Sequence, residues 1–147
     1  MDASAPVAAR GDQVAATLAG SLAARPVLCD LISAQAAVLE RNVSPQVAAT
    51  YKRATIAGVT DLGVLLRQHL PELSEADAFR LAGSTLVSTA ALWQQCQPSA
   101  AILAAYDADP SLAVLRLDFA PTLREMLETL ISGLLARAAN GPSVSRS

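Results

Sequence analysis

Helix-breaking and helix-capping residues divide this chain into five segments, and the apolar residues of each segment recur with the period of an α-helix. Pro26, Pro45 and Pro71 each interrupt the pattern. Ser44 is a suitable N-cap for the segment that starts with Pro45, and Ser74 is a suitable N-cap for the segment that follows Pro71. The helices predicted in this way cover residues 6–24, 26–41, 45–70, 74–95 and 118–139, with a short helical turn at 100–106.

Alanine and leucine dominate these segments. The 147 residues include 31 alanines and 22 leucines but only five aromatic residues. Alanine and leucine are strong helix formers, whereas the β-branched and aromatic residues that favour strands are scarce. We therefore expect an all-α fold, a helical bundle of about five main helices in a single domain over residues 6–140. Residues 1–5 are predicted to be a flexible tail, and residues 141–147 a disordered one.

The charges argue against several functions. Lys and Arg together number 11 and Asp and Glu 13, and the basic residues are scattered rather than clustered on one face. A protein that neutralises nucleic-acid phosphates usually shows a clustered basic surface, so this chain by itself is not expected to bind DNA.

Membrane insertion and secretion are not expected either. The longest stretch without charge, 81–106, is interrupted by Gln94, Gln95 and Gln97, and the N-terminus lacks the pattern of a signal peptide. Cys29 and Cys96 stand alone, without the spacing of a metal site. We expect both to be reduced and packed as small apolar residues in a cytoplasmic protein.

No pattern of catalytic residues is present, and we expect neither enzymatic activity, a cofactor nor a metal site. His69 is the only histidine and falls at the predicted end of a helix, where a cationic ring is favoured by the helix dipole. The acidic pairs 107/109 and 125/128 are too few for a calcium loop and are typical of a solvated surface.

Several polar residues project into apolar helix sectors, namely Gln35, Thr55, Thr85 and Thr89. The threonine hydroxyls can bond to carbonyls of the preceding turn, which we favour for Thr85 and Thr89, or can line an apolar pocket and orient a ligand. For the amide of Gln35 the two interpretations are equally supported. The aromatic residues Tyr51 and Trp93 suit either a core or a pocket wall. The candidate ligand-binding residues are Gln35, Tyr51, Thr55, Thr89 and Trp93.

The segment 74–95 has two apolar sectors rather than one. Phe79, Leu86, Ala90 and Trp93 form the first, and Ala78, Leu81, Leu92 and Cys96 form the second. One sector can face the domain's own core, and the other then requires a partner.

Specific phrases of the sequence resemble a known family. RPVLCDL at 25–31, VLERNVS at 38–44, DFAPTL at 118–123 and GLL at 133–135 are similar to the regulatory domain of tetracycline-repressor (TetR) family transcriptional regulators. The resemblance extends from about residue 14 to residue 138.

This resemblance implies a homodimer that binds a small-molecule effector between its helices. It also implies that 74–95 and 118–139 pack against their symmetry mates as a four-helix bundle. The dimer-interface residues expected on this basis are Ala78, Ala82, Leu92, Leu123, Leu127, Leu130 and Leu134. Complete family members carry a basic helix-turn-helix before this domain, and operator DNA would be a partner only through that segment, which is missing ahead of Val7.

The expected function is therefore effector sensing and homodimerisation in a TetR-type regulator, with a small, largely apolar ligand. One alternative is a helical dimerisation or interaction module without a ligand. A less favoured alternative is a helical enzyme that uses His69 as a base.

Overall fold

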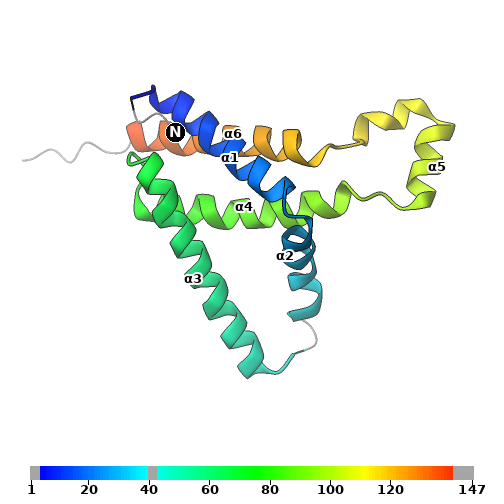
Figure 1. The fold of residues 1–147 in the computed structure, drawn as a ribbon, viewed down its shortest axis with the longest axis horizontal. Helices are drawn as coiled ribbons and strands as arrows, with labels where there is room; N and C mark the ends of the chain where they lie inside the picture. Colours follow the sequence, from blue (N-terminus) through cyan, green and yellow to red (C-terminus); the bar gives the residue numbers. More distant parts are fainter. Residues whose placement is uncertain (1–3, 40–42, 141–147) are drawn as a thin grey trace, which may run out of the picture.

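The computed structural model describes residues 4–39 and 43–140, and every regular element in these two ranges is helical. The elements are α1 (Val7–Ala23), α2 (Pro26–Leu39), α3 (Pro45–His69), α4 (Glu75–Gln95), α5 (Ala100–Ala108), the 3₁₀ helix η1 (Pro110–Leu115) and α6 (Phe119–Ala139) (Figure 1). The predicted all-α fold is confirmed. The tails predicted at 1–5 and 141–147 lie outside the described residues apart from Ser4 and Ala5, as does the end predicted at residue 41.

Serine side chains begin three of these helices. The hydroxyl oxygens of Ser44, Ser74 and Ser99 each accept a hydrogen bond from the backbone amide three residues further on, at 3.1 to 3.4 Å. Each bond satisfies one of the amides that a helix start leaves without an internal partner. The hydroxyl of Ser74 also donates to the carboxylate of Asp77 (2.7 Å), which joins the two residues of the predicted capping pattern.

The core lies where α6 packs against α1 and α4. Leu123, Leu127 and Ile131 of α6 are almost completely buried there. Burial of a side chain of this size contributes about 1.5 to 3 kcal/mol relative to leaving it exposed. Gly11 permits the close approach of α1, because a Cβ at that position would lie 2.9 Å from Cγ2 of Ile131.

The helices α2 and α3 both pack against α4. The two helices α3 and α4 pack at Gly63, where a Cβ would lie 3.5 Å from backbone atoms of Ala78 and Phe79, at ordinary van der Waals contact. Toward the other end of α4, the hydroxyl of Ser33 on α2 donates to the carbonyl of Ala90 (3.2 Å). Away from these crossings α2 and α3 leave α4 and converge on each other (Figure 1).

The segment between α4 and α6 stands apart from the rest of the fold. It contains α5, which the sequence predicts as a short helical turn, and η1, which the sequence does not predict. Neither element has a buried residue, and α5 packs mainly against η1. In Figure 1 the two elements project beyond the ends of α4 and α6.

Candidate ligand-binding groove

A groove of about 1190 Å³ lies between α3 and the part of α4 from Glu75 to Ser88. Val64, Phe79 and Val87 present exposed apolar side chains along it, and Gly63 and Gly83 leave room between them. Ligand sites are typically concave and mostly apolar, with a few polar groups that orient the ligand. The lining residues are Thr60, Gly63, Val64, Arg67, Glu75, Ala76, Ala78, Phe79, Arg80, Gly83, Ser84, Val87 and Ser88.

Charged groups stand among these apolar walls. The Nε of Arg67 donates to the carbonyl of Leu73 (3.2 Å), which orients the guanidinium, and its terminal nitrogens have no partner in the described part of the chain. Arg80 pairs with the carboxylate of Asp77 (2.6 Å). The groove can therefore hold an apolar body against its walls and a polar end at Arg67.

None of the five residues predicted to bind ligand lines this groove. Two of them contact each other instead, because the hydroxyl of Tyr51 on α3 donates to Oε1 of Gln35 on α2 (2.9 Å). The hydroxyl of Thr55 donates to the carbonyl of Tyr51 in the preceding turn (3.1 Å). The Tyr51–Gln35 hydrogen bond joins α2 to α3 and gives the Gln35 amide a partner within the chain, whereas the Thr55 bond lies within α3.

Trp93 connects three helices. Its indole N–H donates to Oδ1 of Asp30 on α2 (2.7 Å), and its ring meets that of Phe119 edge to face, with the centroids 4.9 Å apart. The side chain also borders a smaller depression of about 320 Å³, which is lined by Asp30, Ser33, Ala34, Trp93, Gln94 and Gln97. Its contacts are those of a packing residue whose polar tip is satisfied.

The two buried threonines of α4 differ from each other. The hydroxyl of Thr85 donates to the carbonyl of Leu81 (2.9 Å), which is the expected bond to the preceding turn. Thr89 has no solvent exposure, and its hydroxyl has no partner among the described residues. The back-bond favoured for Thr89 is therefore not made. A buried polar group left unpaired costs about 1 to 3 kcal/mol.

Most of the residues expected at a dimer interface belong instead to the core of a single chain. Ala78, Ala82, Leu92, Leu123, Leu127 and Leu134 are buried, and Leu130 is half-buried. These six side chains are covered within their own chain, and their expected place at a dimer interface stays a prediction. The sector of α4 that contains Ala78 faces its own core, whereas Phe79, in the other sector, is exposed.

The sequence contained an indication of the groove that our selection of polar residues missed. Phe79 belongs to the first of the two apolar sectors of 74–95, and the segment 45–70 is apolar around much of its circumference. Unpartnered apolar sectors on consecutive helices were a better guide to the cavity than isolated polar side chains.

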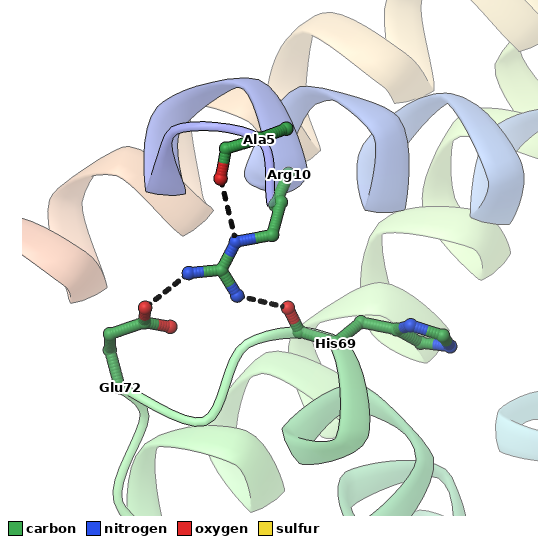
Figure 2. A network of polar contacts seen from close by, with 4 residues as sticks. All are labelled: Ala5, Arg10, His69 and Glu72. Carbon is green, nitrogen blue, oxygen red and sulfur yellow. Dashed lines mark hydrogen bonds and ion pairs between the residues drawn. The ribbon is translucent and has the colours of Figure 1, made fainter. Parts of the chain in front are cut away.

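His69 is exposed, and only its backbone takes part in the polar network shown in Figure 2. Nη1 of Arg10 donates to the carbonyl of His69 (2.6 Å), Nε donates to the carbonyl of Ala5 (3.2 Å), and Nη2 pairs with Glu72. The pKa of Glu72 is lowered first by a backbone hydrogen bond of its own and then by Arg10. The network joins the start of α1 to the turn between α3 and α4.

Burial raises the pKa of both thiols, and neighbouring Asp30 and Asp118 add to the effect at Cys29 and Cys96 respectively. The Cys29 thiol donates to the carbonyl of Leu22 (3.3 Å). Protonated thiols of this kind pack as small apolar groups. Among the described residues, no three or more His, Cys, Asp or Glu side chains gather closely enough to hold a metal ion.

Within residues 4–39 and 43–140, no single helix has the length and apolar composition needed to cross a membrane. One helix pair, α1 with the first part of α2, meets those two criteria jointly but is bent by 91°.

Comparison with known proteins identifies one family. A family model described as the tetracycline repressor-like C-terminal domain matches residues 1–138. No curated protein matches the chain. This match covers residues 14–138, the range in which short stretches of the sequence resemble the same family. It also covers both helices that line the groove.

Proposed function

The chain belongs to the tetracycline repressor-like C-terminal domain family, and from this premise we propose that it is the effector-sensing and homodimerisation domain of a cytoplasmic transcriptional regulator. This family comprises regulatory rather than enzymatic domains. The proposed effector is a small, largely apolar molecule. Operator DNA would be contacted only by a helix-turn-helix outside these residues.

The α3–α4 groove is the observation that carries the proposal. It combines exposed apolar walls with the Arg67 guanidinium, whose terminal nitrogens are unpaired in the described chain. An apolar ligand with one polar or anionic end fits this arrangement, because the walls are covered on binding and the guanidinium gains a partner.

The groove is also placed where a ligand can alter the helix arrangement. The helices α3 and α4 touch at Gly63 and are joined by the short turn after His69. A ligand that prefers one angle between them shifts the population toward that angle. Since Arg10 bonds to the His69 carbonyl and to Glu72, such a shift reaches the first turns of α1. In a complete regulator, α1 would pass the change toward the DNA-binding segment.

Ligand binding can be tested with anilinonaphthalene sulfonate, an apolar fluorescent anion. We expect saturable binding to one site per chain and a melting temperature that rises with probe concentration. Gly83→Trp places a large side chain in the groove and should abolish binding. Gly58→Trp is the matched control, because Gly58 also has open space around it but does not line the groove. Equal probe binding by the two variants would exclude the groove as the site. No saturable binding by the wild type would favour the ligand-free module.

Homodimerisation is proposed through the exposed face of α4 around Ala91, outside the groove, together with the exposed side of α6 around Met126. Sedimentation at micromolar concentration should give twice the 15.2 kDa mass of one chain. A monomer would refute this part of the proposal.

A further inference from the structure

The smaller depression lies where α2 meets the last turn of α4, and it shares no lining residue with the α3–α4 groove. We call it the Asp30 depression. Its volume of about 320 Å³ is at the lower end of the range for ligand sites in proteins. It is therefore a separate concavity of a size that suits a small molecule.

The polar atoms left unpaired in the Asp30 depression are hydrogen-bond acceptors. Oδ1 of Asp30 accepts the indole N–H of Trp93 (2.7 Å), whereas Oδ2 has no partner in the described chain. Nε2 of Gln94 donates to the carbonyl of Ser33 (3.4 Å), whereas the amide oxygen of Gln94 has no partner among the same residues. A ligand that pairs with these two oxygens must donate hydrogen bonds.

The electrostatics of the Asp30 depression favour a positive charge. Asp30 supplies a carboxylate, and none of the six lining residues is Lys or Arg. Trp93 and Gln94 belong to the C-terminal turn of α4, where the helix dipole places partial negative charge. That last turn carries no basic side chain that would neutralise the dipole. A bound cation would interact favourably with both the carboxylate and the helix end.

The indole of Trp93 favours an organic cation over a metal ion. An aromatic ring attracts an ammonium or guanidinium group through its π electrons, and such groups also donate hydrogen bonds. Ca²⁺ requires six to eight oxygen ligands, whereas the depression offers a single carboxylate. The indole is held by its bond to Asp30 and by edge-to-face contact with Phe119, at 4.9 Å between ring centroids, so the site is formed before a ligand binds.

We propose that the Asp30 depression binds a small organic cation with N–H donors, namely a primary ammonium or a guanidinium. Oδ2 of Asp30 and the amide oxygen of Gln94 accept its hydrogen bonds, and the indole of Trp93 contacts its positive charge. Because the lining residues come from both α2 and α4, the bound cation strengthens the contact between these helices. This second site depends neither on the effector groove nor on the homodimer.

Trp93 is the only tryptophan of the chain, so its fluorescence reports directly on the proposed site. We expect n-butylammonium to change this fluorescence in a saturable way and to raise the melting temperature of the full chain. Tetramethylammonium has the same charge but no N–H donor, and it should bind at least about tenfold more weakly. Equal responses to n-butylammonium, tetramethylammonium and sodium, all as chlorides at one ionic strength, would overturn the proposal.

Asp30→Asn removes the negative charge but retains an oxygen that can accept the Trp93 indole N–H. We expect the affinity for n-butylammonium to fall by about tenfold or more. Asp61→Asn is the matched control, because Asp61 is an exposed residue of α3 that lines neither the groove nor the Asp30 depression. It should bind n-butylammonium like the wild type. Equal affinities of the two variants, with equal helix content by circular dichroism, would reject Asp30 as the cation's partner.

Gln97→Lys supplies a cation from within the chain, since Gln97 lines the Asp30 depression. We expect the new ammonium to occupy the site, to raise the melting temperature and to remove the response to n-butylammonium. Gln95→Lys is the control, because it places the same charge at the same end of α4 but outside the depression. If Gln97→Lys still responded to n-butylammonium as strongly as Gln95→Lys does, the Asp30 depression would not be the cation site.

Discussion

Arg10 and His69 are 59 residues apart in the chain, yet Nη1 of Arg10 lies 2.6 Å from the backbone oxygen of His69 (Figure 2). The same guanidinium bonds to the carbonyl of Ala5 and pairs with Glu72. The planar group thus satisfies one carbonyl at the end of α3 and another before α1. No helical periodicity predicts this connection, because it depends on how two helix ends meet.

Arg10→Met should lower the free energy of unfolding by about 1 to 2 kcal/mol, since it leaves two carbonyls and a carboxylate without their partner. Urea denaturation at neutral pH measures the loss. Arg124→Met is the matched control, because the Arg124–Glu128 pair lies on the exposed surface of α6 and should contribute much less to stability than the Arg10 network. If both variants lost the same free energy of unfolding, the Arg10 network would contribute no more to stability than a surface ion pair.

The contribution of Glu72 to the stability of the fold should depend on pH. Its pKa is lowered from 4.5 in the folded chain by its backbone hydrogen bond and by Arg10. A lowered carboxyl pKa stabilises the fold above the unfolded value, and that stabilisation is lost as the pH falls through the folded value. The stability gap between wild type and Arg10→Met should therefore narrow in acid. A gap that stays constant from neutral to strongly acidic pH would contradict the pairing.

Thr89→Val should raise the free energy of unfolding by about 1 kcal/mol or more, because it removes a buried hydroxyl that has no partner in the described chain. Thr85→Val provides the comparison, since it removes a hydroxyl that is bonded to Leu81 and should be neutral or destabilising. Urea denaturation of the two variants gives the difference. A destabilised Thr89→Val would indicate that its hydroxyl binds a group such as a buried water.

Tyr51→Phe should reduce stability by about 0.5 to 1.5 kcal/mol through loss of its hydrogen bond to Gln35. Its affinity for anilinonaphthalene sulfonate should match that of the wild type, because neither residue lines the groove. Chemical denaturation and fluorescence titration separate the two effects. Weaker probe binding at unchanged stability would indicate that Tyr51 binds the ligand.

Two glycines of α1 should respond in opposite directions to alanine. Gly20 has open space around it, so Gly20→Ala should stabilise the chain by about 0.5 to 1 kcal/mol through helix propensity. Gly11→Ala gains the same propensity but forces a Cβ to 2.9 Å from the buried side chain of Ile131. We expect it to be at least about 1 kcal/mol less stable than Gly20→Ala. Thermal melting of both variants tests the close contact between α1 and α6.

The sequence alone was sufficient for the five long helices and for most of their ends, but not for η1 or the full length of α5. Ser44 and Ser74 cap the helices they were expected to cap, and Pro45 occupies the first turn of α3. These features follow from local chemistry, because a cap or a proline acts on backbone groups within a few residues of itself. The family resemblance was likewise carried by short phrases that can be read without knowing their spatial neighbours.

Only the tertiary structure decided which neighbour covers each face. Two apolar sectors on 74–95 were visible in the sequence, but packing against α6 buried the sector of Ala78, and the crossing at Gly63 left Phe79 beside the groove. In the same way, the Gln35 amide accepts a hydrogen bond from Tyr51, whereas the Thr89 hydroxyl has no hydrogen-bond partner in the described chain. Periodicity defines the faces of a single helix, whereas the partner of each face depends on the angles at which separate helices cross.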